Sequence, residues 1–353
     1  MKTIKKTVSL LLALIICLGS VPMTTLASDD LVIEGAWTCQ IENGSAVIYF
    51  ADDTISGDVT IPSVVGGYKV TAIGRRAFKD VNNISSVTIP DSVTVIREDA
   101  FRSSSVTKIN FGKNVSEIGN YAFAFCENLT SVTIPDSVKT IGDFAFTYCI
   151  GLTKLTIGKG VRSIGSNAFN SCTSLKDLTI KEGTTTVGNN AFSFCYELTS
   201  VALPDSVTDI DGHAFRGCNK LMAVTFGENL KTIGYSAFSG CDALTDVYFK
   251  GTTKQWQAVS IGSGNAKLTD AKSHILGDPI IPIIPGKPDT PSNPGTPDNP
   301  GSSDSGNNNP TACDCKCHSK GFKKFIFKLV LFFQKIFRKN QSCSCGALHY
   351  IIL

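Results

Sequence analysis

Apolar and polar residues alternate over short stretches that return at a regular interval along the body of the chain. In the stretch 131–134, Val132 and Ile134 point to one side of an extended strand, whereas Ser131 and Thr133 point to the other. The pattern therefore predicts a series of short β-strands, each with one buried and one exposed face.

An Ala-Phe dipeptide recurs at an almost constant spacing and marks the repeat. Its phenylalanines follow one another at intervals of 23 residues, with one interval of 22. A β-branched residue stands four positions before each of these alanines. The eight phenylalanines are Phe78, Phe101, Phe123, Phe146, Phe169, Phe192, Phe215 and Phe238.

One repeat on its own is too small to bury its apolar side. Stacked copies form a continuous core, so the pattern predicts a β-rich repeat solenoid of about eight 23-residue units. The Ile-Gly step before most Ala-Phe pairs predicts a second short strand, and the Ala-Phe segment is expected to form a helical turn or a tight bend. With neighbouring parallel strands ~5 Å apart, the eight units would extend about 40 Å.

Six cysteines occupy the same position of the repeat, three residues after a phenylalanine. Equivalent residues of neighbouring units would lie about 5 Å apart, a separation that allows a disulfide. Their side chains would point in parallel, however, which is poor geometry for that bond, and free cysteine packs as a small hydrophobic residue. We therefore expect a buried structural column of Cys126, Cys149, Cys172, Cys195, Cys218 and Cys241.

The repeat L-T-S-V-T-I-P-D-S-V-x-x-I-G-x-x-A-F-x-x-C, seen at residues 129–149, resembles the BspA-like leucine-rich repeat family of bacterial surface and secreted proteins. The resemblance covers roughly residues 45–250. The stretch Gly66-Gly67-Tyr68 and the stretch 251–265 are similar to the family's opening and closing segments, which would cap the open sheet edges. The resemblance implies extracellular display and adhesion or protein binding, and it fixes no ligand.

The first residues are typical of an export signal, so we expect residues 1–27 to be a signal peptide and residues 28–277 to be the solenoid with its end caps. Three lysines precede the apolar run 8–18, and small residues end at Ala27. The run is too short to span a bilayer, which needs ~20 residues. A lipoprotein cysteine at Cys17 is the alternative, although the two isoleucines before it fit such a site poorly.

Prolines fall at every third position from Pro279 to Pro300. Polyproline II has three residues per turn, so residues 278–310 are expected to be a disordered linker that acts as an extended stalk. Residues 311–353 form a basic tail in which phenylalanines and lysines are mixed over 320–339, a pattern that predicts one amphipathic helix. Such a helix suits a membrane interface, and a buried helix in a small tail domain is the alternative.

Seven cysteine and histidine residues bracket this predicted helix. Thiolate and imidazole ligands at this density suit Zn²⁺. Two disulfides with one thiol left over are the alternative, because an exported chain can meet an oxidant. The predicted zinc ligands are Cys313, Cys315, Cys317, His318, Cys343, Cys345 and His349.

Charge and the distribution of histidines exclude several functional classes. Residues 29–277 contain 21 Lys and Arg and 25 Asp and Glu, so the net charge of the body is near −4. A mildly acidic body argues against nucleic-acid binding, which needs a basic surface. The body has two histidines, His213 and His274, and neither belongs to a recognisable catalytic set. We therefore expect that the protein is not an enzyme and that the solenoid needs no cofactor.

Outward-facing strand positions form two polar columns, which are the candidate ligand face. A flat surface of this kind can bind a protein or a glycan by many small contacts. The alternative is that threonine merely suits an exposed strand. The candidate residues are Ser131, Thr133, Lys154, Thr156, Asp177 and Thr179.

Aromatic residues form two further columns beside the Ala-Phe pairs. Tyr121 and Phe144 share one, and Phe125, Tyr148 and Phe194 share the other. Exposed aromatic residues are good interface anchors, but we expect these to pack between coils.

Together these features predict a secreted protein, associated with the cell surface, that binds a host or bacterial surface protein or glycan. The stalk would extend the solenoid, and the tail would dock it to the envelope. A structural spacer without a specific ligand is the second hypothesis, because a repeat fold does not by itself specify a function.

Overall fold

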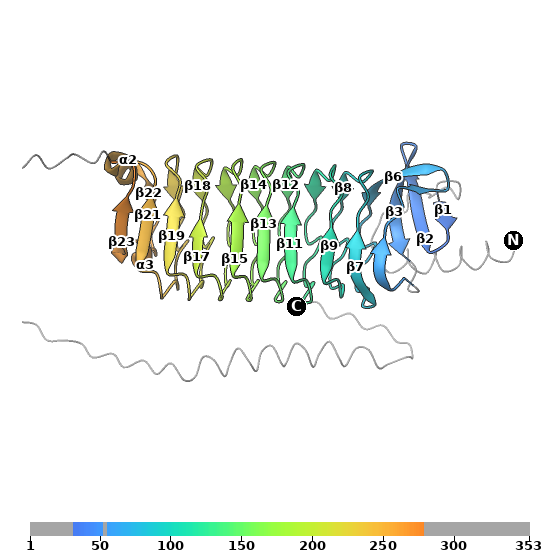
Figure 1. Cartoon of the computed structure of the whole chain (residues 1–353), viewed down its shortest axis with the longest axis horizontal. Helices are drawn as coiled ribbons and strands as arrows, with labels where there is room; N and C mark the ends of the chain where they lie inside the picture. Colours follow the sequence, from blue (N-terminus) through green and yellow to red (C-terminus); the bar gives the residue numbers. More distant parts are fainter. Residues whose placement is uncertain (1–30, 52–54, 279–353) are drawn as a thin grey trace, which may run out of the picture. The chain divides into compact units, whose positions relative to one another are not determined.

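The computed structural model describes residues 31–51 and 55–278. They form a β-solenoid of about ten turns with a spacing of about 23 residues (Figure 1). Eight of these turns, called coils below, contain the Ala-Phe pair, and the end segments add the others. The predicted repeat solenoid is therefore confirmed. The signal peptide, most of the linker and the whole tail lie outside the described residues.

One side of the solenoid is a sheet of 13 strands, called sheet 1. From β6 onward its strands along the path are parallel, and most are two residues long, one exposed or half-buried and one buried. Its strands are β1 (Leu31–Glu34), β2 (Trp37–Glu42), β3 (Ser45–Ala51), β5 (Val64–Val65), β6 (Tyr68–Ile73), β8 (Val95–Ile96), β10 (Glu117–Ile118), β12 (Thr140–Ile141), β14 (Ser163–Ile164), β16 (Thr186–Val187), β18 (Asp209–Ile210), β20 (Thr232–Ile233) and β22 (Ser260–Ile261).

The alternating stretches form the second side, which is divided into a six-stranded sheet 2 and a four-stranded sheet 3. Both are parallel throughout. Sheet 2 contains β4 (Gly57–Thr60), β7 (Ile84–Thr88), β9 (Lys108–Asn110), β11 (Ser131–Ile134), β13 (Lys154–Ile157) and β15 (Asp177–Ile180). Sheet 3 contains β17 (Ser200–Ala202), β19 (Ala223–Phe226), β21 (Asp246–Phe249) and β23 (Lys272–Ile275).

The Ala-Phe segments form the third side, called the turn edge. They are tight bends rather than helical turns, because two residues in each bend have a positive φ between 51° and 75°. The bends are joined by a ladder in which the Phe146 N–H donates to the Ala168 carbonyl of the next coil at 2.7 Å. In sheet 1 the direction is reversed, since the Gly142 N–H donates to the Ile118 carbonyl of the preceding coil at 2.8 Å.

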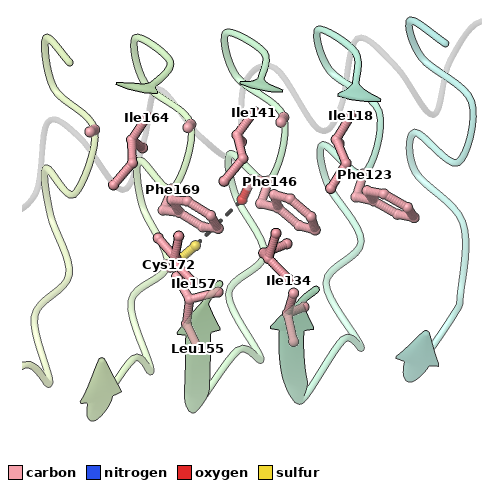
Figure 2. Packing of buried hydrophobic residues seen from close by; sticks show 14 of the residues in the cluster. Ile118, Phe123, Ile134, Ile141, Phe146, Leu155, Ile157, Ile164, Phe169 and Cys172 are labelled. Atoms are coloured by element: carbon pink, nitrogen blue, oxygen red, sulfur yellow. Dashed lines mark hydrogen bonds between the residues drawn. The ribbon is translucent and has the colours of Figure 1, made fainter. Parts of the chain in front are cut away.

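The core is a set of columns of identical side chains between the three sides (Figure 2). Phe146, Phe169 and Phe192 have no exposed surface and stack with centroid separations of 5.2 and 5.4 Å. The isoleucines of sheet 1 and the apolar residues of sheet 2 enclose this column. Each coil therefore contributes the same set of apolar side chains and depends on its neighbours to bury them.

The end segments place a tryptophan against aromatic residues at each end of the core. At the N-terminal end, the Trp37 ring contacts the first phenylalanine of the column, Phe78, edge-on at 6.2 Å. At the C-terminal end, Trp256 of helix α2 (Thr253–Ala258) stacks on Phe226 at 5.8 Å. A second short helix, α3 (Ala266–Asp270), follows β22.

A buried asparagine completes the backbone hydrogen bonds at the C-terminal end. The Asn265 side-chain oxygen accepts from the N–H of Phe238, the last phenylalanine of the column, at 3.0 Å. Its side-chain nitrogen donates to the carbonyls of Gly234 and Gly262. The Asn265 oxygen thus takes the place of the alanine carbonyl that accepts from the equivalent phenylalanine N–H in the preceding coils.

Candidate ligand-binding face

The six predicted ligand-face residues lie together on three adjacent strands of sheet 2. On β11, β13 and β15, Ser131 is in register with Lys154, and Lys154 with Asp177. Thr133, Thr156 and Thr179 form the parallel column one pleat away. The sequence prediction of which side chains share this face therefore agrees with the strand register.

The polar groups of these six side chains are not used inside the protein. Five of the residues are exposed and Thr156 is half-buried. Within the described chain, none of the six side chains makes a hydrogen bond or an ion pair. On the preceding strands of the same face, by contrast, Ser86 Oγ donates to Asp58 at 2.6 Å and the Asn110 amide donates to Thr88 at 3.1 Å. On β11, β13 and β15 the outward donors and acceptors are thus free, as is the exposed ammonium of the neighbouring Lys108 on β9.

The opposite side of the same three strands holds this face rigid. Val132 and Ile134 of β11, and Leu155 and Ile157 of β13, are at most 1% exposed and belong to the core. Because side chains alternate along a strand, burial of these residues fixes the outward direction of their neighbours.

The face ends at a break in the hydrogen-bonded strand order. Sheet 2 stops at β15 and sheet 3 starts at β17, without pairing between them. Beside the break, the Lys181 ammonium binds the Asp136 carboxylate at 3.1 Å. The Lys159 N–H and the Lys181 ammonium together hold the pKa of Asp136 below its usual value. These contacts join the loops that follow β11, β13 and β15 in the sequence.

Comparison with known proteins agrees with this architecture. Residues 50–161 and 139–261 match the BspA type leucine rich repeat region, with six copies, and together they span more than half of the 353 residues. The chain belongs to the BspA-type leucine-rich repeat family. No curated protein matches it.

Solved structures of bacterial repeat proteins are similar to this BspA-type chain. A leucine-rich repeat protein from Bacteroides ovatus is 26% identical, with a TM-score of 0.54, and the match covers 71% of each chain. A leucine rich cell surface protein from Faecalibacterium prausnitzii is 23% identical over 67% of this chain and 99% of that one, with a TM-score of 0.33. The leucine rich repeat protein of T. pallidum is 22% identical over 66% of this chain and 87% of that one, with a TM-score of 0.39.

The six repeat cysteines of this BspA-type chain are free and buried, as the sequence predicts. Each thiol donates to the carbonyl of the phenylalanine in the preceding coil, as Cys172 does to Phe146 at 3.4 Å (Figure 2). Burial raises the pKa of Cys195 to about 12, and it raises the pKa of Cys172 in the same direction. A buried thiol with a raised pKa is a poor nucleophile, so this column is structural.

The two body histidines lie in separate places. His274 Nε2 is 2.8 Å from Asp246 Oδ1, and its ring stacks on Tyr248 at 4.4 Å. The hydrogen bond between His274 and Asp246 is the main cause that lowers the pKa of the Asp246 carboxyl group. His213 instead contacts the ring of Tyr235 on the turn edge.

Among the described residues, no group of three or more His, Cys, Asp or Glu is placed to hold a metal. The predicted zinc ligands of the tail lie outside the described residues.

The aromatic columns pack as expected only in part. Tyr121 stacks on Phe144 at 4.8 Å and Phe125 on Tyr148 at 5.1 Å, so packing between coils is confirmed for these pairs. Tyr148 packs on the neighbouring coil in this way and is nevertheless 48% exposed, whereas the ring contact of Phe194 is with Tyr196 of its own coil. Sequence reasoning also missed Arg102, whose guanidinium lies 5.6 and 5.4 Å from the Tyr121 and Phe125 ring centroids. The sequence contained one indication of this contact, because Arg102 directly follows the repeat phenylalanine Phe101 and therefore lies in the bend.

Proposed function

We propose that the protein is an exported, cell-surface binding protein whose solenoid presents the β11–β15 face to a protein or glycan ligand. The observation that carries this proposal is the set of six side chains held in register with no hydrogen bond or ion pair of their own. The strands that carry these side chains are fixed by the core, so binding a partner requires no ordering of the backbone. Lys154 beside Asp177 offers both signs of charge to a partner.

Family membership supports binding at a surface, because BspA-type repeat proteins are often surface proteins involved in binding. The export signal predicted at 1–27 is consistent with this location. In the described part of the chain, helices are too short to traverse a bilayer. We propose that the stalk 278–310 holds the solenoid away from the envelope. The tail 311–353 would dock to the envelope through its basic amphipathic segment, with Zn²⁺ held by its cysteines and histidines.

Removing the two charges of the face is expected to weaken ligand binding at least about tenfold. In the variant Lys154→Ser/Asp177→Ser, both side chains are exposed and unpaired, so the free energy of unfolding should change by less than ~0.5 kcal/mol. A screen of matrix proteins and surface glycans with the full chain identifies the ligand, and titration gives its affinity for each variant.

The matched control is Lys231→Ser/Asp242→Ser, which removes the same charges from exposed positions elsewhere on the solenoid. It should bind like the wild type. Equal affinity of all three proteins would contradict the assignment of this face, and a solenoid that binds nothing in the screen would favour the structural spacer.

Deleting the linker and tail is expected to release the protein from the cell. We expect the full chain in the envelope fraction and a chain that ends at Asp278 in the medium, because only the former has the basic tail. Fractionation of the native host with an antibody against the solenoid measures this. Recovery of both forms in the medium would refute anchoring by the tail.

A further inference from the structure

The turn edge contains positions where an aromatic residue is costly. In each bend, the residue before Ala and the residue two after Phe have a positive φ, as at Asn167 with 56° and Ser171 with 59°. This left-handed region favours glycine, asparagine and aspartate. Most coils place such small or polar residues there.

Five of these positions nevertheless hold aromatic residues, with φ between 55° and 61°: Tyr121, Phe125, Phe144, Tyr148 and Phe194. The bend does not need them. The ladder bond from Phe169 to Ala191, in the bend built with asparagine and serine, is 2.8 Å, against 2.7 Å for the bend of Phe146. A strained conformation that the fold does not require points to a role in function.

The rings are held in fixed orientations. Tyr121 and Phe144 stack with an interplanar angle of 5°, and Phe125 and Tyr148 with 13°. Arg102 lies over the first ring of each pair and is itself held by the buried carboxylate of Asp99 at 3.2 Å. The aromatic pairs are thus ordered before any ligand arrives.

Three neighbouring apolar side chains on the same edge are open to solvent: Tyr148 is 48%, Ile150 38% and Tyr196 41% exposed. Tyr196 also contacts the ring of Phe194 at 6.2 Å. Tyr148 and Tyr196 belong to the coils of Phe146 and Phe192, so one coil lies between them. Both phenols can donate and accept hydrogen bonds.

Between these rings the turn edge is polar but almost uncharged. The intervening coil contributes the side chains of Asn167, Asn170 and Ser171. From Tyr121 to Gly217, the residue before each Ala and the two residues after each Phe include one formal charge, Arg216, which lies over the Phe194 ring at 5.8 Å. Among the charges that border these positions, Arg102 is paired with Asp99 at 3.2 Å and Glu197 with Lys220 at 2.6 Å. We therefore expect ring faces, amides and hydroxyls, and not charge attraction, to contribute most to ligand binding by this surface.

We propose that this aromatic turn edge is a second binding site, separate from the β11–β15 face, and that it takes a neutral β-linked glycan. Tyr148 stacks on Phe125 with one ring face, and the next coil places the small Ser171 at the equivalent position, so its other face has no ring against it. The apolar C–H face of a sugar ring can pack on this electron-rich face, and the sugar hydroxyls can pair with amide and hydroxyl side chains. The coils also repeat at a spacing close to that of successive sugars in an extended β-linked chain, as the ring separations of 4.8 to 5.4 Å show. Consecutive coils can therefore contact consecutive sugars.

The test is titration of the full chain with neutral β-linked hexasaccharides of glucose, xylose and mannose. Neutral probes avoid attraction to the basic tail. We expect one of them to bind the wild type and to bind Tyr148→Ser/Tyr196→Ser at least about tenfold more weakly, as for loss of two aromatic anchors. The control Tyr68→Ser, which removes a tyrosine that is 39% exposed outside the turn edge, should bind like the wild type.

Three results would overturn the proposal. The first is that no neutral hexasaccharide binds the wild type. The second is equal affinity of the wild type and the double variant for the saccharide that binds. The third is loss of a protein ligand by the double variant in the absence of any saccharide binding, which would make the turn edge a protein contact. None of these results depends on Lys154 or Asp177. The experiment therefore tests the turn edge independently of the β11–β15 face.

Discussion

Replacement of Phe169 by alanine is expected to lower the free energy of unfolding by about 3–5 kcal/mol. The ring has no exposed surface and lies between Phe146 and Phe192, within 5.2 and 5.4 Å of their centroids. Its loss leaves a cavity in the middle of the column and removes contacts with both neighbouring coils. Because each coil of a solenoid is stabilised by its neighbours, the variant should also divide the array into two weaker parts.

Urea unfolding followed by circular dichroism measures this effect. The matched control is Phe144→Asn, two residues before the Phe146 of the column, which removes a half-buried ring from a position where φ is 57°. Asparagine accepts that conformation, so the control should stay within about 1 kcal/mol of the wild type. A loss at Phe169 no larger than the loss at Phe144 would contradict the assignment of Phe169 to the structural column.

Alkaline pH is expected to destabilise the solenoid through its cysteine column. Burial raises the pKa of Cys195 from 9.0 to about 12. Between these two values the unfolded chain has released the thiol proton that the folded chain still holds. The free energy of unfolding therefore falls as pH rises from 9 to 12, by about 1.4 kcal/mol per pH unit for each such cysteine. Below pH 9 this contribution is fully present.

Unfolding free energies measured at several pH values above 9 test this linkage. The variant Cys195→Ala lacks one titrating thiol, so its free energy should fall less steeply by about 1.4 kcal/mol per pH unit. The other titrating groups cancel in the comparison except the thiols of Cys172 and Cys218, whose pKa Cys195 helps to raise and which stay buried in the variant. In native protein at pH 8, mass spectrometry should also find the six repeat thiols unalkylated by iodoacetamide. Identical slopes, or ready alkylation of Cys195, would show that the column is open to solvent.

The strands and the core could be predicted from the sequence because their signal is local and repeated. Alternation over 131–134 identifies the face on which Ser131 and Thr133 lie, since side chains of a strand alternate strictly. A common period of 23 residues then places Lys154 and Asp177 beside Ser131. The same argument puts the cysteines in one buried column.

The turn edge could not be predicted in this way. The spacing of Ala-Phe shows that a bend exists, but not that its residues adopt positive φ, because Tyr121 and Phe144 are residue types that rarely do so. Whether Tyr148 is covered depends on the size of its neighbours in the next coil. That is a property of packing and not of its own position in the repeat.

The sequence by itself determined the family, the parallel stacking and the identity of the core columns, because one repeated pattern permits only one register of coil on coil. Only the tertiary structure decided which polar side chains make no hydrogen bond within the protein. Ser86 and Thr88 have the same pattern as Ser131 and Thr133, yet the first two are occupied by Asp58 and Asn110. Hydrogen bonds of this kind depend on side chains in adjacent coils, whose separation and direction exist only after the chain has folded.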